Sequence, residues 1–119
     1  MTLQECYAAL GGDYEDVLGR LRSERLIQKF VLKFLDDGSY DLLTASMEAG
    51  SWEEAFRAAH TIKGMCQNLS FTKLLESDSA LTEALRGEAD AEAARRLKEQ
   101  VDKDYKQVAD SIKAFQAGL

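Results

Sequence analysis

The sequence predicts an all-α fold, an antiparallel four-helix bundle with additional short N-terminal helices. The 119 residues include no proline, alanine and leucine dominate, and the strand-forming valine and isoleucine are scarce. Apolar side chains recur in steps of three and four along most of the chain, as on the buried faces of helices. The length suits a single domain over residues 1–119, with 1–22 as a helical cap and 24–117 as the bundle.

Glycines and small polar residues divide the chain into helical segments. The expected segments are residues 2–10, 13–22, 24–37, 39–50, 51–69, the stretch from a turn at 70–72 to Gly87, and a final helix that begins at Asp90. Asp13, Ser39 and Asp90 are candidate N-caps, because their side chains can accept a backbone N–H. Ser51 and Glu54 are spaced as a capping box, in which each side chain accepts a backbone N–H of the first turn.

Each bundle segment carries an apolar stripe. In chain order the stripes are Leu26, Ile27, Phe30, Val31, Phe34 and Leu35, continued by Tyr40, Leu43 and Met47; then Ala55, Ala58, Ile62, Met65, Cys66 and Leu69; then Leu74, Leu75, Leu81 and Leu85; and finally Ala94, Leu97, Val101, Tyr105, Val108, Ile112 and Phe115. Ser77 and Asp78 interrupt the third stripe. They indicate a rotated helix, or a polar layer or exposed edge.

Charge and cysteine content restrict the class of protein. The chain has 21 acidic and 15 basic residues, a net charge of -6, which argues against nucleic acid or an anionic membrane as the main partner. No apolar run reaches the ~18–20 residues that span a bilayer, and no signal peptide opens the chain, so a cytoplasmic location is expected. Cys6 and Cys66 are expected to be buried or half-buried free thiols.

His60 is the only histidine, and it lies in the run Ala59-His60-Thr61-Ile62-Lys63-Gly64. At about 100° per residue, the apolar stripe of its helix lies within roughly 60° of the direction opposite His60. We therefore expect the imidazole to project into solvent. Its expected neighbours on the helix surface are Glu53, Phe56, Arg57, Lys63, Gly64 and Gln67.

Several of these neighbours favour the handling of phosphate. Lys63, one turn on, can stabilise a phosphoryl group with its compact positive charge, and Arg57 is a second cation. Gln67 offers a neutral donor. Gly64 removes a side chain that would block a second protein from reaching the ring. Imidazole titrates close to neutral pH, so a neutral nitrogen is available for attack.

Two neighbours leave alternatives open. Phe56 is either buried under the next helix or exposed as an anchor for a partner. Glu53 either orients the imidazole through a hydrogen bond or belongs only to the solvated start of the helix.

Other chemistry has little support in the sequence. One histidine cannot assemble a metal cluster, and no cofactor is expected. No serine or cysteine lies one turn from His60 on the same face, and the serine nearest to that face is Ser70 at the helix end. The chain has no P-loop and no glycine-rich nucleotide loop, so it is expected to carry phosphate rather than to be an enzyme.

The residues around His60 resemble the signature of the histidine-containing phosphotransfer (HPt) domain, in which His-x-Leu/Ile-Lys-Gly recurs. The resemblance extends to an upstream helix with Phe30 and Phe34, to the turn Gly50-Ser51-Trp52, and to the leucine-rich helix over 74–85. The chain departs from the family pattern at Met65 and Cys66, where small residues are common, and at Ser70, where a second glycine is common.

The resemblance implies a place in a multistep phosphorelay. His60 accepts phosphate from the aspartate of a response-regulator receiver domain, or from a histidine kinase, and passes it to another receiver. Mg²⁺ is then supplied by the receiver, and the carrier is a monomer. Lys63 and Gln67 stabilise the phosphate, Gly64 gives access, and Phe56, Arg57, Ser70 and Phe71 are expected to contact the partner.

Three other readings remain. The alternatives are the phosphoacceptor domain of a chemotaxis-type kinase, a non-phosphorylated helical adaptor that binds a receiver or kinase, and an enzyme of unknown chemistry. The lone histidine is the only support for the last of these.

Overall fold

A computed structural model describes all of residues 1–119, and its only regular secondary structure is helix. Its helices are α1 (Leu3–Leu10), α2 (Tyr14–Leu21), α3 (Glu24–Asp36), α4 (Ser39–Glu48), α5 (Trp52–Leu69), α6 (Thr72–Leu85) and α7 (Ala91–Ala117). The prediction of an all-α chain is therefore confirmed. None of these helices combines the length and the apolar composition needed to cross a bilayer.

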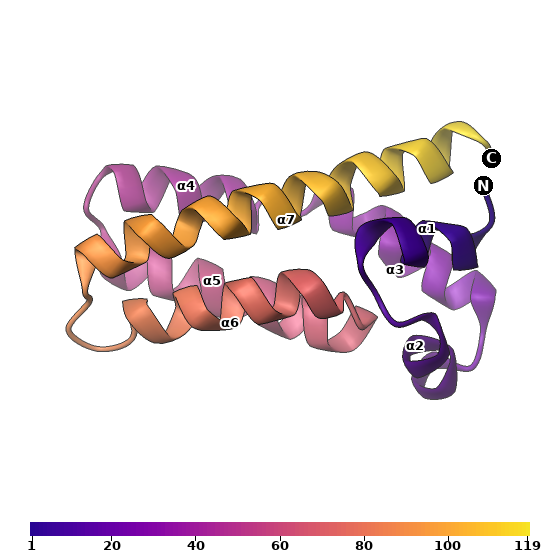
Figure 1. The fold of residues 1–119 in the computed structure, drawn as a ribbon, viewed down its shortest axis with the longest axis horizontal. Coiled ribbons are helices and arrows are strands. Elements are labelled where there is room, and N and C mark those ends of the chain that lie inside the picture. Colours follow the sequence, from indigo (N-terminus) through magenta and orange to yellow (C-terminus); the bar gives the residue numbers. More distant parts are fainter.

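The four C-terminal helices lie side by side along the long axis, and each runs opposite to the one before it (Figure 1). α5 packs against α4 and α6, and α6 packs against α7. The 27 residues of α7 extend for about 40 Å, close to the 41 Å length of the molecule. α1 packs on the C-terminal half of α7, while α2 and α3 lie at the same end (Figure 1).

Short polar side chains cap four of the helices. Thr2, Asp13, Ser23 and Asp90 each accept the N–H of the residue three positions on. These bonds satisfy one of the backbone donors that the first turn of a helix leaves free. The expected caps at Asp13 and Asp90 are confirmed.

Two expected caps are wrong. The residue before α4 is Gly38, and the N–H of Ser39 is held by the carboxylate of Asp37 at 2.8 Å. Ser51 makes no capping hydrogen bond, so the capping box at the start of α5 does not form. The reason is the tight turn from α4, in which the N–H of Ser51 donates to the carbonyl of Ser46 at 2.8 Å and fixes the local backbone.

Twenty-five buried apolar residues form one core that draws on all seven helices. Phe71 lies near its centre, with its ring 5.7 Å from that of Tyr7 and 5.1 Å from that of Phe34. The predicted stripes supply most of this core. Leu26 is the exception, because its side chain is 36% exposed on the outer side of α3.

Asp78 is a polar residue inside the core. It is fully buried on α6, while Leu74, Leu81 and Leu85 also point inward, so the helix is not rotated and a polar site interrupts its stripe. The Thr82 hydroxyl donates to the Asp78 carbonyl at 2.7 Å and lies 3.5 Å from Oδ2, while Oδ1 has no partner. Burial raises the pKa of this carboxyl to about 7, against smaller opposing effects of Thr82 and Lys63.

Replacement of Asp78 by asparagine is expected to stabilise the protein in a pH-dependent way. The folded-state pKa is about 7 and the unfolded value about 3.9, so the unfolded chain ionises first. The free energy of unfolding of the wild type must then decrease as the pH rises from the unfolded-state pKa to the folded-state pKa. At higher pH it stays at the lower value. We expect Asp78→Asn to gain about 1–3 kcal/mol at pH 8 and little at pH 4.

Urea denaturation at pH 4, 6 and 8 measures this difference. Glu99→Gln is the matched control, because Glu99 is exposed on α7 and makes no side-chain hydrogen bond. A stability gain for Asp78→Asn that did not change with pH would contradict the conclusion that the ionised carboxylate of Asp78 destabilises the wild-type protein.

Candidate functional site

His60 lies in the middle of α5 on its solvent-facing side. The helix buries the opposite face against its neighbours, and the His60 side chain is exposed, as the helical periodicity predicts. The residues of α5 that the structure buries are Ala55, Ala58, Ala59, Ile62, Cys66 and Leu69. Because this face fixes the rotation of α5, it also fixes the outward direction of the imidazole.

Phe56 supports the imidazole from one turn earlier. The two rings meet edge to face, with centroids 5.8 Å apart and planes at 78°. Phe56 is half-buried against the core. It is therefore neither fully covered by the next helix nor fully exposed to a partner. Neither ring nitrogen of His60 takes part in a hydrogen bond within the chain. The ring is thus positioned by packing while both nitrogens stay free.

The cations near His60 differ in what they contact. Arg57 donates to Glu53 at 2.6 Å, and both side chains are largely exposed. Glu53 is therefore engaged with Arg57 rather than with the imidazole. Lys63 is half-buried and makes no ion pair shorter than 4 Å. Of the two predicted cations, Lys63 is the one whose ammonium is not already paired.

Gly64 lies on the exposed surface beside His60, and Gln67 is exposed one turn further along. A Cβ placed on Gly64 would meet no side chain and no other segment within 4 Å. Glycine inside a helix costs about 1 kcal/mol relative to alanine, and the fold itself offers no reason for it here. The space that a Cβ on Gly64 would fill therefore remains open on the surface around His60.

Two of the residues expected to contact a partner are inaccessible. Phe71 is fully buried and Ser70 is 5% exposed, so the expectation that they dock a partner is wrong. Phe71 fills the centre of the core. Ser70 ends α5 in the left-handed conformation, at φ 56°, and its hydroxyl donates to Asp16 at 2.6 Å. Phe56 and Arg57 remain on the accessible side.

Arg20 of α2 is a contributor that sequence reasoning missed. Its guanidinium donates to the carbonyls of Gln67 at 3.0 Å and Asn68 at 2.9 Å, at the C-terminal end of α5. The hydroxyl of Tyr7 donates to the carbonyl of Leu69 at 2.8 Å. These donors satisfy carbonyls that the last turn of a helix leaves free, and the positive charge suits that end of the helix dipole. Nothing in the sequence links residues so far apart.

Arg86, at the end of α6, is the second residue that was missed. Its Cζ lies 5.0 Å from the centre of the Phe56 ring, on which His60 also packs. Two of its nitrogens donate to the two carboxylate oxygens of Glu83, each at 3.1 Å. The end of α6 therefore brings a cation, paired with an anion, onto the aromatic ring that packs against His60.

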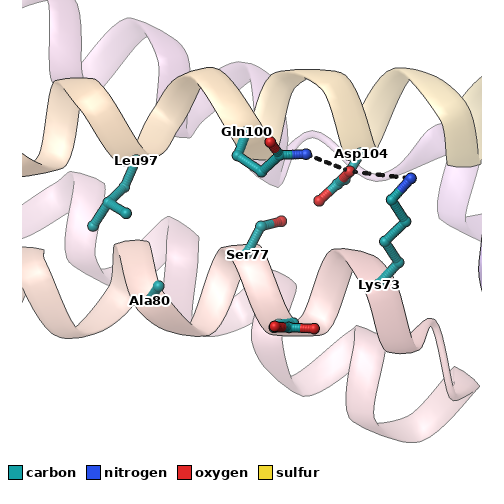
Figure 2. A pocket seen from close by; sticks show the side chains of 7 residues that line it. Lys73, Ser77, Ala80, Leu97, Gln100 and Asp104 are labelled. Atoms are coloured by element: carbon teal, nitrogen blue, oxygen red, sulfur yellow. Dashed lines mark hydrogen bonds and ion pairs between the residues drawn. The ribbon is translucent and has the colours of Figure 1, made fainter.

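A groove between α6 and α7 is separate from this site. It encloses about 350 Å³ and is lined by Lys73, Glu76, Ser77, Ala80, Leu97, Gln100 and Asp104. Figure 2 shows Lys73 and Gln100 pointing toward the buried carboxylate of Asp104, which they contact at 3.8 and 3.0 Å. None of the side chains around His60 lines this groove.

Both cysteines are buried free thiols, as expected. Burial raises the pKa of Cys6 to about 11 and raises that of Cys66 further. Neither thiol is therefore ionised near neutral pH.

Comparison with known proteins gives one match. The model of the family described as Hpt domain matches residues 25–111, from the start of α3 into α7. No curated protein and no solved structure matches the chain. The match covers most of the chain, so the protein belongs to the Hpt domain family. Membership implies phosphotransfer in two-component signalling, with receiver or kinase domains as partners. Helices α1 and α2 lie outside the matched residues.

Replacement of Arg20 by alanine is expected to destabilise the fold by about 1 kcal/mol, because the last carbonyls of α5 lose their cationic donor. Urea denaturation measures the loss. Arg25→Ala is the control, since Arg25 is exposed and makes no side-chain hydrogen bond. Equal stability of the two variants would show that the Arg20 contacts contribute nothing.

Proposed function

We propose that this protein carries phosphate on His60 in a multistep phosphorelay. It accepts the phosphoryl group from the aspartate of a receiver domain, or from a histidine kinase, and passes it to a second receiver. The observation that carries the proposal is the exposed, hydrogen-bond-free imidazole of His60 within the family motif, beside the unpaired Lys63 and the open surface at Gly64.

The proposed step is an in-line exchange between the two proteins. A neutral nitrogen of His60 attacks the phosphorus of the aspartyl phosphate, the N–P bond forms, the P–O bond breaks, and the aspartate leaves as a carboxylate. The receiver supplies Mg²⁺ and most of the catalytic groups. This chain contributes an accessible nucleophile, and the charge of Lys63 with the amide of Gln67 to stabilise the phosphoryl group.

The proposed docking surface consists of the exposed side of α5 around His60. Phe56 and Arg57 flank the ring and remain available to a receiver. We propose that residues 24–117 act as one antiparallel four-helix bundle that presents this surface, that residues 1–22 support the bundle as a cap, and that the protein acts as a monomer. The support comes from the contacts of α1 with α7 and of Arg20 with the end of α5.

His60→Gln separates the carrier from an adaptor that binds without being phosphorylated. Wild-type protein treated with phosphoramidate should gain one acid-labile phosphate by intact mass, and should lose it when a receiver domain and Mg²⁺ are added. The variant should do neither, because no imidazole nitrogen remains to be phosphorylated. Equal signalling output from the wild type and the variant in a reconstituted relay would favour the adaptor.

Gly64→Ala is expected to make the protein more stable and the transfer of phosphate to a receiver slower. The free energy of unfolding should rise by about 0.5–1 kcal/mol, because alanine is the better helix former and its methyl group meets no obstacle. The rate of transfer to a receiver should fall, since the methyl group lies on the surface that the partner must approach.

Gly19→Ala is the matched control for this experiment. Gly19 lies in α2, is also exposed, and also has open space around an added Cβ. It should gain similar stability with an unchanged transfer rate. A Gly64→Ala variant that transfers as fast as Gly19→Ala would show that Gly64 does not provide access.

A further inference from the structure

The end of α6 brings an ion pair to Phe56, the side chain that packs against the proposed phosphate-carrying histidine. Arg86 holds Glu83 through two parallel hydrogen bonds of 3.1 Å, and its guanidinium lies over the ring of Phe56 at 5.0 Å. The Phe56 ring also packs edge to face against the His60 ring, with centroids 5.8 Å apart. One aromatic side chain thus joins the imidazole of α5 to the guanidinium of α6.

Glu83 is the negative charge of this group, and it interacts with two cations. The Arg86 guanidinium lowers the pKa of the Glu83 carboxyl, and the Lys63 ammonium adds a smaller effect in the same direction. Lys63 itself makes no direct ion pair. The carboxylate of Glu83 is therefore held by Arg86 and lies within the electrostatic influence of Lys63.

The Glu83–Arg86 pair is suited to exchange partners. Both side chains are more than half exposed, at 59% and 54%, and exposed ion pairs stabilise a fold only slightly. A phosphoryl group carries about -1.5 to -2 charges near pH 7 and offers three oxygens to a planar guanidinium. A bidentate arginine–phosphate pair is among the stronger charge-assisted hydrogen bonds. A phosphoryl group near Arg86 is thus a stronger competitor than the carboxylate.

We propose that Arg86 is a phosphate-stabilising residue and that Glu83 is its resting partner, which the phosphoryl group on His60 displaces. This inference rests on the proposed phosphorylation of His60 and adds the residues that determine how tightly the phosphoryl group is held. Arg86 leaves Glu83 when His60 becomes phosphorylated and returns to it after transfer. Lys63 contributes from α5 and Arg86 from α6, so the two cations approach from different helices.

The test is the titration of the phosphohistidine followed by ³¹P NMR on the full-length chain loaded with phosphoramidate. A nearby cation favours the more highly charged phosphoryl form and lowers its pKa. Arg86→Ala should raise the phosphoryl pKa by roughly half a unit, and Arg86→Lys should raise it by less. Glu83→Gln should lower it, because the competing anion is gone.

Arg95→Ala is the matched control. Arg95 also packs on an aromatic ring, but it lies in α7, with its Cζ 5.3 Å from the centre of Trp52 at the start of α5. It makes no cation–π contact with Phe56. The phosphoryl pKa of the phosphohistidine in the Arg95→Ala variant should equal that of the wild type. Far-UV circular dichroism of each variant verifies that the fold is intact.

The possible outcomes separate this inference from the function on which it rests. A phosphohistidine signal whose pKa is the same in wild type and Arg86→Ala would overturn the role of Arg86 while leaving the carrier function standing. No phosphohistidine signal in the wild type would overturn both. Opposite shifts for Arg86→Ala and Glu83→Gln, with no shift for Arg95→Ala, are the expected result.

Discussion

The burial of one face of α5 between its neighbours is the constraint on which the rest of the structure depends. Small side chains at Ala55, Ala58 and Ala59 are fully or almost fully enclosed, so α4 and α6 pack directly against the helix. A helix that is fixed in rotation on one face must present the other face in one orientation. The exposure of His60 is therefore a consequence of core packing.

The N-terminal helices complete the end of α5 rather than forming a separate unit. Arg20 and Tyr7 bind its last carbonyls, and the hydroxyl of Ser70 donates to Asp16. Ser70 adopts a left-handed conformation, which costs energy for a side chain with a Cβ. Its hydrogen bonds to α2 offset that cost. Helix α2, which lies outside the residues matched by the family model, thus stabilises the left-handed residue that ends α5.

The electrostatics of the proposed site contrast with the net charge of -6. Lys63 and Arg86 add positive charge on this side of the molecule, while Glu53 is paired with Arg57 and Glu83 with Arg86. Beneath this surface, burial keeps Asp78 protonated to a higher pH than an exposed carboxyl. Local charge, and not the average over the chain, decides what this surface can hold.

The sequence by itself determined the helical class, most helix boundaries, the buried stripes and the outward direction of His60. These features follow from periodicity and composition, which act over a few residues. Local patterns gave the wrong caps at Ser39 and Ser51, because the preceding segment lies so close that the backbone N–H of each serine is already hydrogen-bonded to it. They also missed the burial of Phe71, whose place in the core depends on Tyr7 and Phe34.

Only the tertiary structure decided that Asp78 is buried, that Arg20 closes the end of α5, and that Arg86 meets Phe56 beside the histidine. Each of these contacts joins different helices. Their geometry depends on how the helices pack, and a sequence pattern that repeats every three or four residues carries no information about which partner lies across the interface.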